Sequence, residues 1–135
     1  MKVLITRIDP DLPLPRFAKG GDAGADVYSR IDISIAPGER ALVPTGIAIA
    51  LPQGFAAFAH LRSGLAIKHG ISMVNAPGTI DAGFRGELQI ILINHDLKET
   101  FSTSFYATAT YPINRSTALE TKKTLNVSRY VKILC

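Results

Sequence analysis

The chain almost lacks two residue types, cysteine and tryptophan. Of its 135 residues one is cysteine, Cys135, and none is tryptophan. A single terminal cysteine excludes an intramolecular disulfide and makes a metal cluster or a buried nucleophile there a poor expectation. No apolar run approaches the roughly 20 residues that span a bilayer, and Arg7 and Asp9 interrupt any signal-peptide core. We therefore expect a cytoplasmic protein that makes no membrane contact.

Glycine and net charge are unevenly distributed. All eleven glycines lie between Gly20 and Gly86. Residues 1–99 hold ten basic and ten acidic residues, so their charges cancel, whereas residues 100–135 hold five basic and one acidic residue and carry the whole net charge of +4. Because these basic residues are dispersed, we expect a solvated surface and no nucleic-acid partner. The prediction is a domain at 1–99 followed by an atypical, Ser/Thr-rich basic tail at 100–135.

Short apolar segments between turn residues predict an all-β sandwich or barrel in the first hundred residues. With 47% hydrophobic residues, the chain has the core and the length of one domain. Ile47–Leu51 and Ile90–Ile93 are apolar on both faces, which indicates complete burial or a subunit interface. The predicted strands are Val3–Asp9, Ile31–Ala36, Arg40–Pro44, Ile47–Leu51, Phe55–Leu61, Ile71–Val74 and Glu87–Asn94, and the predicted helix is Ser63–His69.

The tail has a weaker pattern. Thr100–Tyr111 is a candidate strand, Leu119–Leu125 a candidate short helix, and Asn126–Leu134 another candidate strand. No turn signal joins them.

Residues 75–87, NAPGTIDAGFRGE, carry the strongest sign of chemistry. Asp81 stands between two predicted glycine turns, at 77–78 and 82–83, and glycine lets a ligand approach the main chain closely. A carboxylate held there can take a proton from a water molecule, as a general base does. Phe84 and the arginine after it add a flat ring and a cation. The alternative is that Asp81 only caps backbone groups of its turn.

Residues 61–66, LRSGLA, follow a predicted strand and open the predicted helix. The Ser63 hydroxyl, the Gly64 amide and the free N–H groups of a helix start form an anion site suited to phosphate. The alternative is a plain helix cap with Ser63 at the N-cap position. Arg62 either binds phosphate or pairs with a structural carboxylate.

Residues 22–29, DAGADVYS, place Asp22 and Asp26 among small residues. A carboxylate near a phosphate site can hold Mg²⁺ directly or through water, and the alternative is another solvated turn. The three histidines share no ligand spacing, so we do not expect a zinc site.

In their order along the chain, these three segments resemble motifs one to three of the trimeric dUTP diphosphatases (dUTPases). The resemblance covers about residues 1–99. It implies a jelly-roll-like β fold and a homotrimer whose active sites are shared between subunits. It also implies hydrolysis of dUTP to dUMP and diphosphate with Mg²⁺, which keeps uracil out of DNA.

The same resemblance implies roles for individual residues. Asp81 matches the general base, and Asp26 matches the carboxylate that engages Mg²⁺ through water. Asn75 and the backbone of the hairpin at residues 78–81 match the element that reads uracil. Phe84 matches the family's usual tyrosine, whose ring stacks on deoxyribose and excludes a 2′-hydroxyl. The implied substrate-binding residues are Arg62, Ser63, Gly64, Asn75, Gly78, Thr79, Ile80 and Phe84.

The tail departs from the family pattern. A fourth motif close to Gly-Asp-Arg-Ile-Ala-Gln, which contacts phosphate, and a glycine-rich fifth motif that closes over the nucleotide are both missing after Thr100. Loss of such electrostatic clamps lowers phosphoryl-transfer rates by orders of magnitude. Our hypothesis is that a reading-frame shift near residues 100–104 replaced the native end, and a true divergent tail is the alternative. Two smaller departures are Phe84 itself and Leu61, where the family commonly has proline.

Two other functions fit parts of the sequence. A dCTP deaminase shares the third motif but needs a glutamate in the following strand, where this chain has Ile91, a residue that cannot transfer protons. A trimeric β module that binds nucleotide or protein without turnover is the non-enzymatic alternative, favoured by the missing fourth and fifth motifs.

Overall fold

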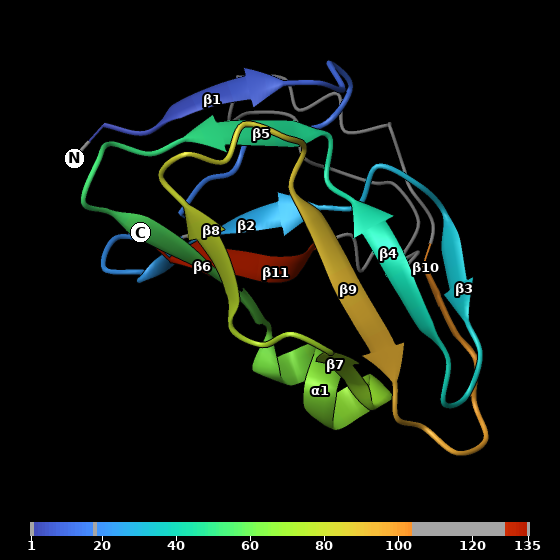
Figure 1. Cartoon of the computed structure of the whole chain (residues 1–135). Helices are drawn as coiled ribbons and strands as arrows, with labels where there is room; N and C mark the ends of the chain where they lie inside the picture. Colours follow the sequence, from blue (N-terminus) through green and yellow to red (C-terminus); the bar gives the residue numbers. More distant parts are fainter. Residues whose placement is uncertain (1, 18, 104–128, 135) are drawn as a thin grey trace, which may run out of the picture.

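A computed structural model describes residues 2–17, 19–103 and 129–134 of the chain (Figure 1). Every pairing between its named strands is antiparallel, and the predicted all-β fold is confirmed. The elements are β1 Leu4–Arg7, β2 Gly24–Tyr28, β3 Ile33–Ile35, β4 Arg40–Pro44, β5 Ile47–Ala50, β6 Ala56–Leu61, α1 Ser63–His69, β7 Ile71–Met73, β8 Gly78–Asp81, β9 Gln89–Asn94, β10 Phe101–Thr103 and β11 Arg129–Leu134.

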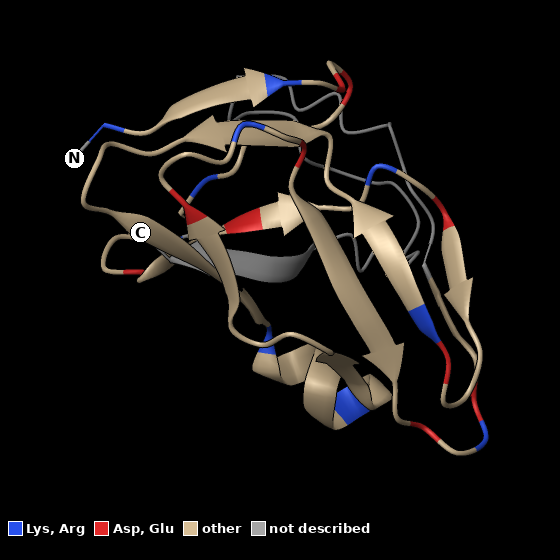
Figure 2. Cartoon of the chain, in the orientation of Figure 1, with Lys and Arg blue, Asp and Glu red and all other residues tan. Residues whose placement is uncertain are grey.

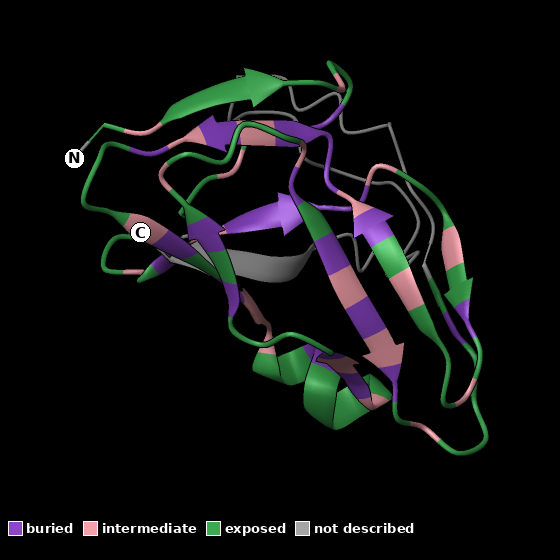
Figure 3. Cartoon of the chain, viewed as in Figure 1, coloured by how far each residue is buried: buried purple, intermediate pink, exposed green. Residues whose placement is uncertain are grey.

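The two larger sheets have the strand orders β2-β11-β6-β8 and β4-β9-β7, and the pairs β1-β5 and β10-β3 stand beside them. Val27, Ala57 and Ile80 from the first sheet join Val43 and Leu92 from the second in one buried cluster. Figure 3 shows buried and partly buried residues alternating along β9, as expected for a strand with one face on the core. The core therefore lies between the sheets. Within the described ranges, no helix has the length and apolar character needed to cross a bilayer.

Most predicted elements are confirmed with small changes at their ends. β4 and α1 have the predicted bounds, and the other predicted strands of the first hundred residues shorten by one to three residues. In the tail, β10 lies within the first candidate strand and β11 within the last. The rest of 104–128, including the candidate helix Leu119–Leu125, lies outside the described residues.

Two strands, β2 and β8, were not predicted because their sequences are rich in small and turn-forming residues. The turn predicted at residues 77–78 is wrong at Gly78. The observed turn occupies residues 74–77, and Gly78 begins β8. A Cβ atom on Gly78 would lie 3.5 Å from the Cβ of Ala59, its partner on β6. Glycine here therefore lets two strands pack closely.

A buried amide closes the connection after β9. The Asn94 Nδ2 donates to the carbonyls of Ile35 and Glu99 at 2.9 and 2.8 Å, and its Oδ1 accepts the Asp96 N–H at 2.9 Å. The Asp96 carboxylate accepts the N–H groups of Glu99 and Lys98, and these bonds lower the pKa of Asp96 below its ordinary value. The acid thus stays ionised and holds the turn that follows β9.

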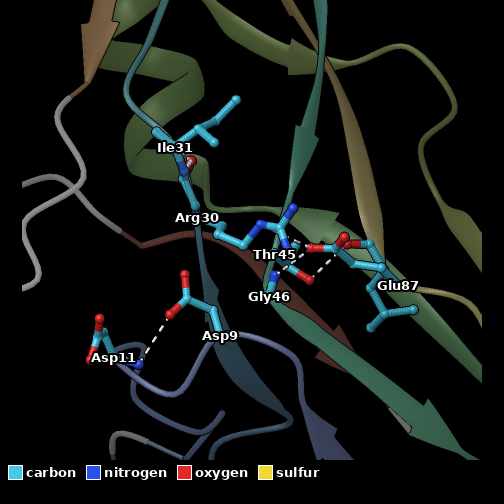
Figure 4. Close-up of polar contacts among 9 residues, drawn as sticks. Asp9, Asp11, Arg30, Ile31, Thr45, Gly46 and Glu87 are labelled. Carbon is cyan, nitrogen blue, oxygen red and sulfur yellow. Dashed lines mark hydrogen bonds and ion pairs between the residues drawn. The ribbon is translucent and has the colours of Figure 1, made fainter.

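Gly46, in the turn between β4 and β5, is a junction of three segments (Figure 4). Its N–H donates to the Glu87 Oε1 at 2.8 Å, and its carbonyl accepts the N–H groups of Ile8 and Asp9 at 2.8 and 3.1 Å. The Arg30 Nε lies 3.6 Å from the same Glu87 oxygen. Gly46 and Glu87 therefore tie together the N-terminal segment, the residues after β2 and the loop that precedes β9.

We predict that Gly46→Ala destabilises the fold far more than Gly38→Ala. Both glycines have positive φ, +70° and +77°, so the backbone strain is matched. A Cβ on Gly46 would lie 2.7 Å from the Cδ1 of buried Leu12 and 2.9 Å from the Cβ of Asp9, whereas a Cβ on Gly38 meets nothing within 4 Å. Overpacking of this kind costs about 1–3 kcal/mol, so urea unfolding should separate the two variants by that amount. Equal free energies of unfolding for the two variants would contradict the role of Gly46 as a close-packed junction.

Candidate active site

One sheet, β2-β11-β6-β8, carries both predicted carboxylates: Asp26 lies in β2, and Asp81 ends β8. In β11, position 132 pairs with Asp26 of β2 on one side and with His60 of β6 on the other. Asp81 stands opposite Ala56, four positions before His60 on β6. Since side chains alternate between the faces of a strand, Asp26 and Asp81 share one face. The opposite face, with Val27, belongs to the core.

Asp26 is buried and paired with Arg62. The Oδ2 of Asp26 lies 3.6 Å from an Arg62 guanidinium nitrogen, and the exposed fractions of the two side chains are 3% and 39%. The Asp26 N–H also donates to the Arg16 carbonyl at 3.3 Å. Arg62 therefore covers a carboxylate on one side and faces solvent on the other. A pair of this kind can present a cation to an incoming anion without leaving its acid unpaired.

The start of α1 adjoins this pair. The N-cap residue is Arg62, in an extended conformation and with no side-chain capping bond. The alternative interpretation of Ser63 as N-cap is therefore wrong, because Ser63 is the first helical residue. Ser63 and Gly64 are exposed, and the N–H groups of the first helical residues have no acceptor within their own helix. A phosphate oxygen is a suitable acceptor for them.

β8 is an edge strand, because it pairs with β6 on one side and ends the sheet order on the other. Gly78 and Ile80 are buried, whereas Thr79 and Asp81 are exposed. The Asn75 Nδ2 lies 3.5 Å from the point that a Cβ on Gly78 would occupy, so its amide borders the start of the strand. An edge strand presents backbone N–H and C=O groups in alternation. A flat ring with donors and acceptors along its edge can pair with such a strand.

The loop after β8 holds the aromatic ring. The Phe84 N–H donates to the Asp81 carbonyl at 3.0 Å, which confirms the turn at 82–83. One Arg85 guanidinium nitrogen donates to the carbonyls of Ala82 and Phe84 at 2.6 and 2.7 Å. The cation expected beside the ring therefore bonds to carbonyls of its own loop. Phe84 remains 42% exposed.

The predicted residues fall into two groups that one chain does not bring together. The anion group contains Asp26, Arg62, Ser63 and Gly64. The hairpin group contains Asn75, Gly78, Thr79, Ile80, Asp81 and Phe84. The strands of Asp26 and Asp81 are three spacings apart in the sheet order, about 14 Å at the usual strand separation. The two carboxylates are also four positions apart along the strands, so a single reacting phosphate within one chain does not reach both.

The sequence reasoning missed two supports of these groups. Glu87, the last residue of the third segment, fixes the far end of the Phe84 loop through Gly46 and Arg30 (Figure 4). β11 lies between β2 and β6 and so joins the two strands that hold the anion group. The glycine and the acid at 46 and 87 are 41 residues apart, and no local pattern links them.

The charges around these groups are mixed. Figure 2 shows acidic and basic residues of the described chain intermixed, mostly in loops and at strand ends. Among the described residues, no three of His, Cys, Asp and Glu gather where they could share a metal ion. A cation near Asp26 would therefore need further oxygen ligands from water or from a phosphorylated ligand.

A model of the dUTPase family matches residues 11–105. The chain belongs to the dUTPase family. It is 57% identical over 100 residues to the deoxyuridine 5′-triphosphate nucleotidohydrolase of Streptomyces coelicolor, which covers 74% of this chain and 55% of that one. It is 64% identical over 96 residues to the same enzyme of Thermobifida fusca, which covers 71% and 54%. The chain thus spans about half the length of these relatives.

Solved structures of the family have the same fold. The dUTPase of Staphylococcus aureus phage phi11 is 27% identical, with a TM-score of 0.67 over 72% of this chain and 62% of that chain. The dUTPase of Staphylococcus bacteriophage 80alpha is 19% identical, with a TM-score of 0.71 over 98% and 80%. This second likeness concerns the fold alone. The family match ends at residue 105, close to the start of the basic segment at residue 100.

Proposed function

We propose that this chain is a subunit of a cytoplasmic dUTP diphosphatase, which hydrolyses dUTP to dUMP and diphosphate. The observation that carries the proposal is Asp81, exposed at the end of an edge strand whose outer backbone is open to a base. Its position next to the Phe84 turn places a base-reading edge, a carboxylate and a ring within seven residues. Membership of the dUTPase family supports the choice of substrate.

In the proposed reaction, Asp81 accepts a proton from a water molecule, whose oxygen attacks the α-phosphorus of dUTP. The bond from the α-phosphorus to the bridging oxygen breaks, and diphosphate leaves with that oxygen. Asn75 and the outer backbone of β8 hold the uracil ring, and the Phe84 ring lies against the deoxyribose. Arg62 and the N–H groups of Ser63 and Gly64 bind the phosphate oxygens. They stabilise the negative charge that increases on the leaving diphosphate.

The residues present fit Mg²⁺ bound through water and the substrate. One buried carboxylate, Asp26, lies beside the phosphate-binding residues, and Mg²⁺ in phosphate-transferring sites is usually held by one or two carboxylates plus phosphate oxygens. Asp26 would orient the metal's waters, and the ion would neutralise charge on the triphosphate. A similar solved structure, a phage phi11 dUTPase mutant, describes the coordination of a structural Mg(II) ion.

We propose that the active form is a homotrimer in which the hairpin group of one subunit meets the anion group of another. The separation of Asp26 and Asp81 supports this, because one reacting phosphate needs both. Large apolar side chains are also exposed on the single chain, among them Leu4 at 60%, Phe17 at 61% and Phe55 at 51%. Since subunit interfaces cover contiguous apolar surface, we expect the trimer to bury some of these side chains.

The trimer predicts a solution mass of about 43 kDa, three times the 14.5 kDa chain. Sedimentation equilibrium at micromolar concentration measures it directly. If the protein is a monomer and still releases diphosphate from dUTP, one chain forms the complete active site and the proposed trimer is wrong.

We predict that Asp81→Asn lowers the rate of diphosphate release from dUTP with Mg²⁺ by at least about a hundredfold, because general-base catalysis contributes 10²–10⁴-fold. Asn keeps the size of the side chain but cannot take the proton. Asp11→Asn, an exposed acid in the N-terminal loop, is the control and should keep wild-type activity. Full activity of Asp81→Asn would remove Asp81 from the base's role.

The second candidate, a trimeric module that binds nucleotide without turnover, is favoured by the missing fourth and fifth motifs. The same assay separates the two functions. Diphosphate release supports the enzyme, whereas dUMP binding by calorimetry without any release supports the module.

We further propose that residues 100–135 arose by a reading-frame shift near 100–104. The switch in charge after residue 99 lies close to the end of the family match at residue 105, and no glycine follows Gly86. The coding DNA tests this directly. One alternative frame downstream should encode a segment close to Gly-Asp-Arg-Ile-Ala-Gln, and its absence from both frames would favour a divergent tail.

A further inference from the structure

The ring of Phe84 occupies the space that a side chain at Gly86 would fill. A Cβ atom on Gly86 would lie 2.9 Å from the Phe84 Cζ, 3.3 Å from Cε2 and 3.6 Å from Cε1. Non-bonded carbon atoms are optimally separated by about 3.5–4.0 Å. The ring therefore rests in this position because residue 86 has no side chain.

The backbone that carries the ring is held separately. The Phe84 N–H and carbonyl bond to Asp81 and to the Arg85 guanidinium, and Glu87 fixes the end of the loop at Gly46. With the backbone fixed, the orientation of the ring depends on the side-chain torsions of Phe84. Phenylalanine has no hydroxyl with which to anchor its tip, so the free space at Gly86 is one determinant of where the ring rests.

We propose that Gly86 is a seat for the Phe84 ring and, through it, a specificity-determining position for the sugar of the nucleotide. This rests on the proposed function, in which the ring lies against the deoxyribose. A ring held against Gly86 presents a fixed surface, and an added 2′-hydroxyl must displace it. A ring pushed off its seat by a methyl group contacts deoxyribose less well and leaves room for ribose.

Gly83, in the same loop, provides a matched control. A Cβ on Gly83 would meet nothing within 4 Å, and neither glycine has the positive φ that strains alanine. Because Phe84 is 42% exposed, its ring can swing away from a methyl group at 86, so both variants should fold.

The experiment compares dUMP and UMP binding by calorimetry in wild type, Gly86→Ala and Gly83→Ala. Gly86→Ala should bind dUMP about two- to thirteenfold more weakly, the range expected from an aromatic contact worth about 0.5–1.5 kcal/mol, and should lose part of the preference over UMP. Gly83→Ala should stay within about twofold of wild type. Identical dUMP/UMP ratios in all three proteins would overturn the proposal.

A nucleotide-free measurement tests the seat itself. In the NMR spectrum, the ring current of Phe84 should displace a Gly86 Hα resonance, and Phe84→Leu should remove the displacement. An undisplaced resonance in wild type overturns the seat, whether or not Gly86→Ala folds. A displaced resonance in a protein that binds neither nucleotide supports the seat and overturns the proposed function instead.

Discussion

The absence of a side chain at Gly46 is the constraint on which much of this fold depends. The N-terminal segment crosses Gly46 so closely that a Cβ there would lie 2.7 Å from Leu12, and two of its N–H groups bond to the Gly46 carbonyl. The Gly46 N–H in turn holds Glu87, which Arg30 also approaches. Glu87 ends the loop that carries Asp81 and Phe84. The geometry of the hairpin group therefore depends on Gly46, which lies 41 residues before Glu87 in the chain.

Glycine has three different tasks around the hairpin group. At Gly46 it permits a positive φ and a close crossing, at Gly78 it lets β8 pack on β6, and at Gly86 it leaves room for an aromatic ring. A sequence shows the glycine but not which of these tasks it performs. That ambiguity explains why Gly78 was assigned to a turn although it begins a strand.

Local patterns were sufficient where residues act through their neighbours in sequence. α1 and β4 appear with their predicted bounds because apolar spacing and flanking turn residues define both. β2 is not predicted because Gly24, Ala25 and Asp26 have low strand propensity, and long-range pairing with β11 makes them a strand. The sequence offers a structural carboxylate as one partner for Arg62 but does not identify it as Asp26, because that pair follows from sheet order, which periodicity does not encode.

The position of β11 has a consequence for how the protein folds. Arg129 pairs with Tyr28 and Val131 with Leu61, so the contacts that join β2 to β6 span most of the chain. Pairings of such long sequence separation are slow to form because loop closure must precede them. Until they form, β2 and β6 expose unpaired edges that invite pairing with other chains. The anion group thus depends on pairing with the far end of the chain, whereas the hairpin group rests on the more local pairing of β6 with β8.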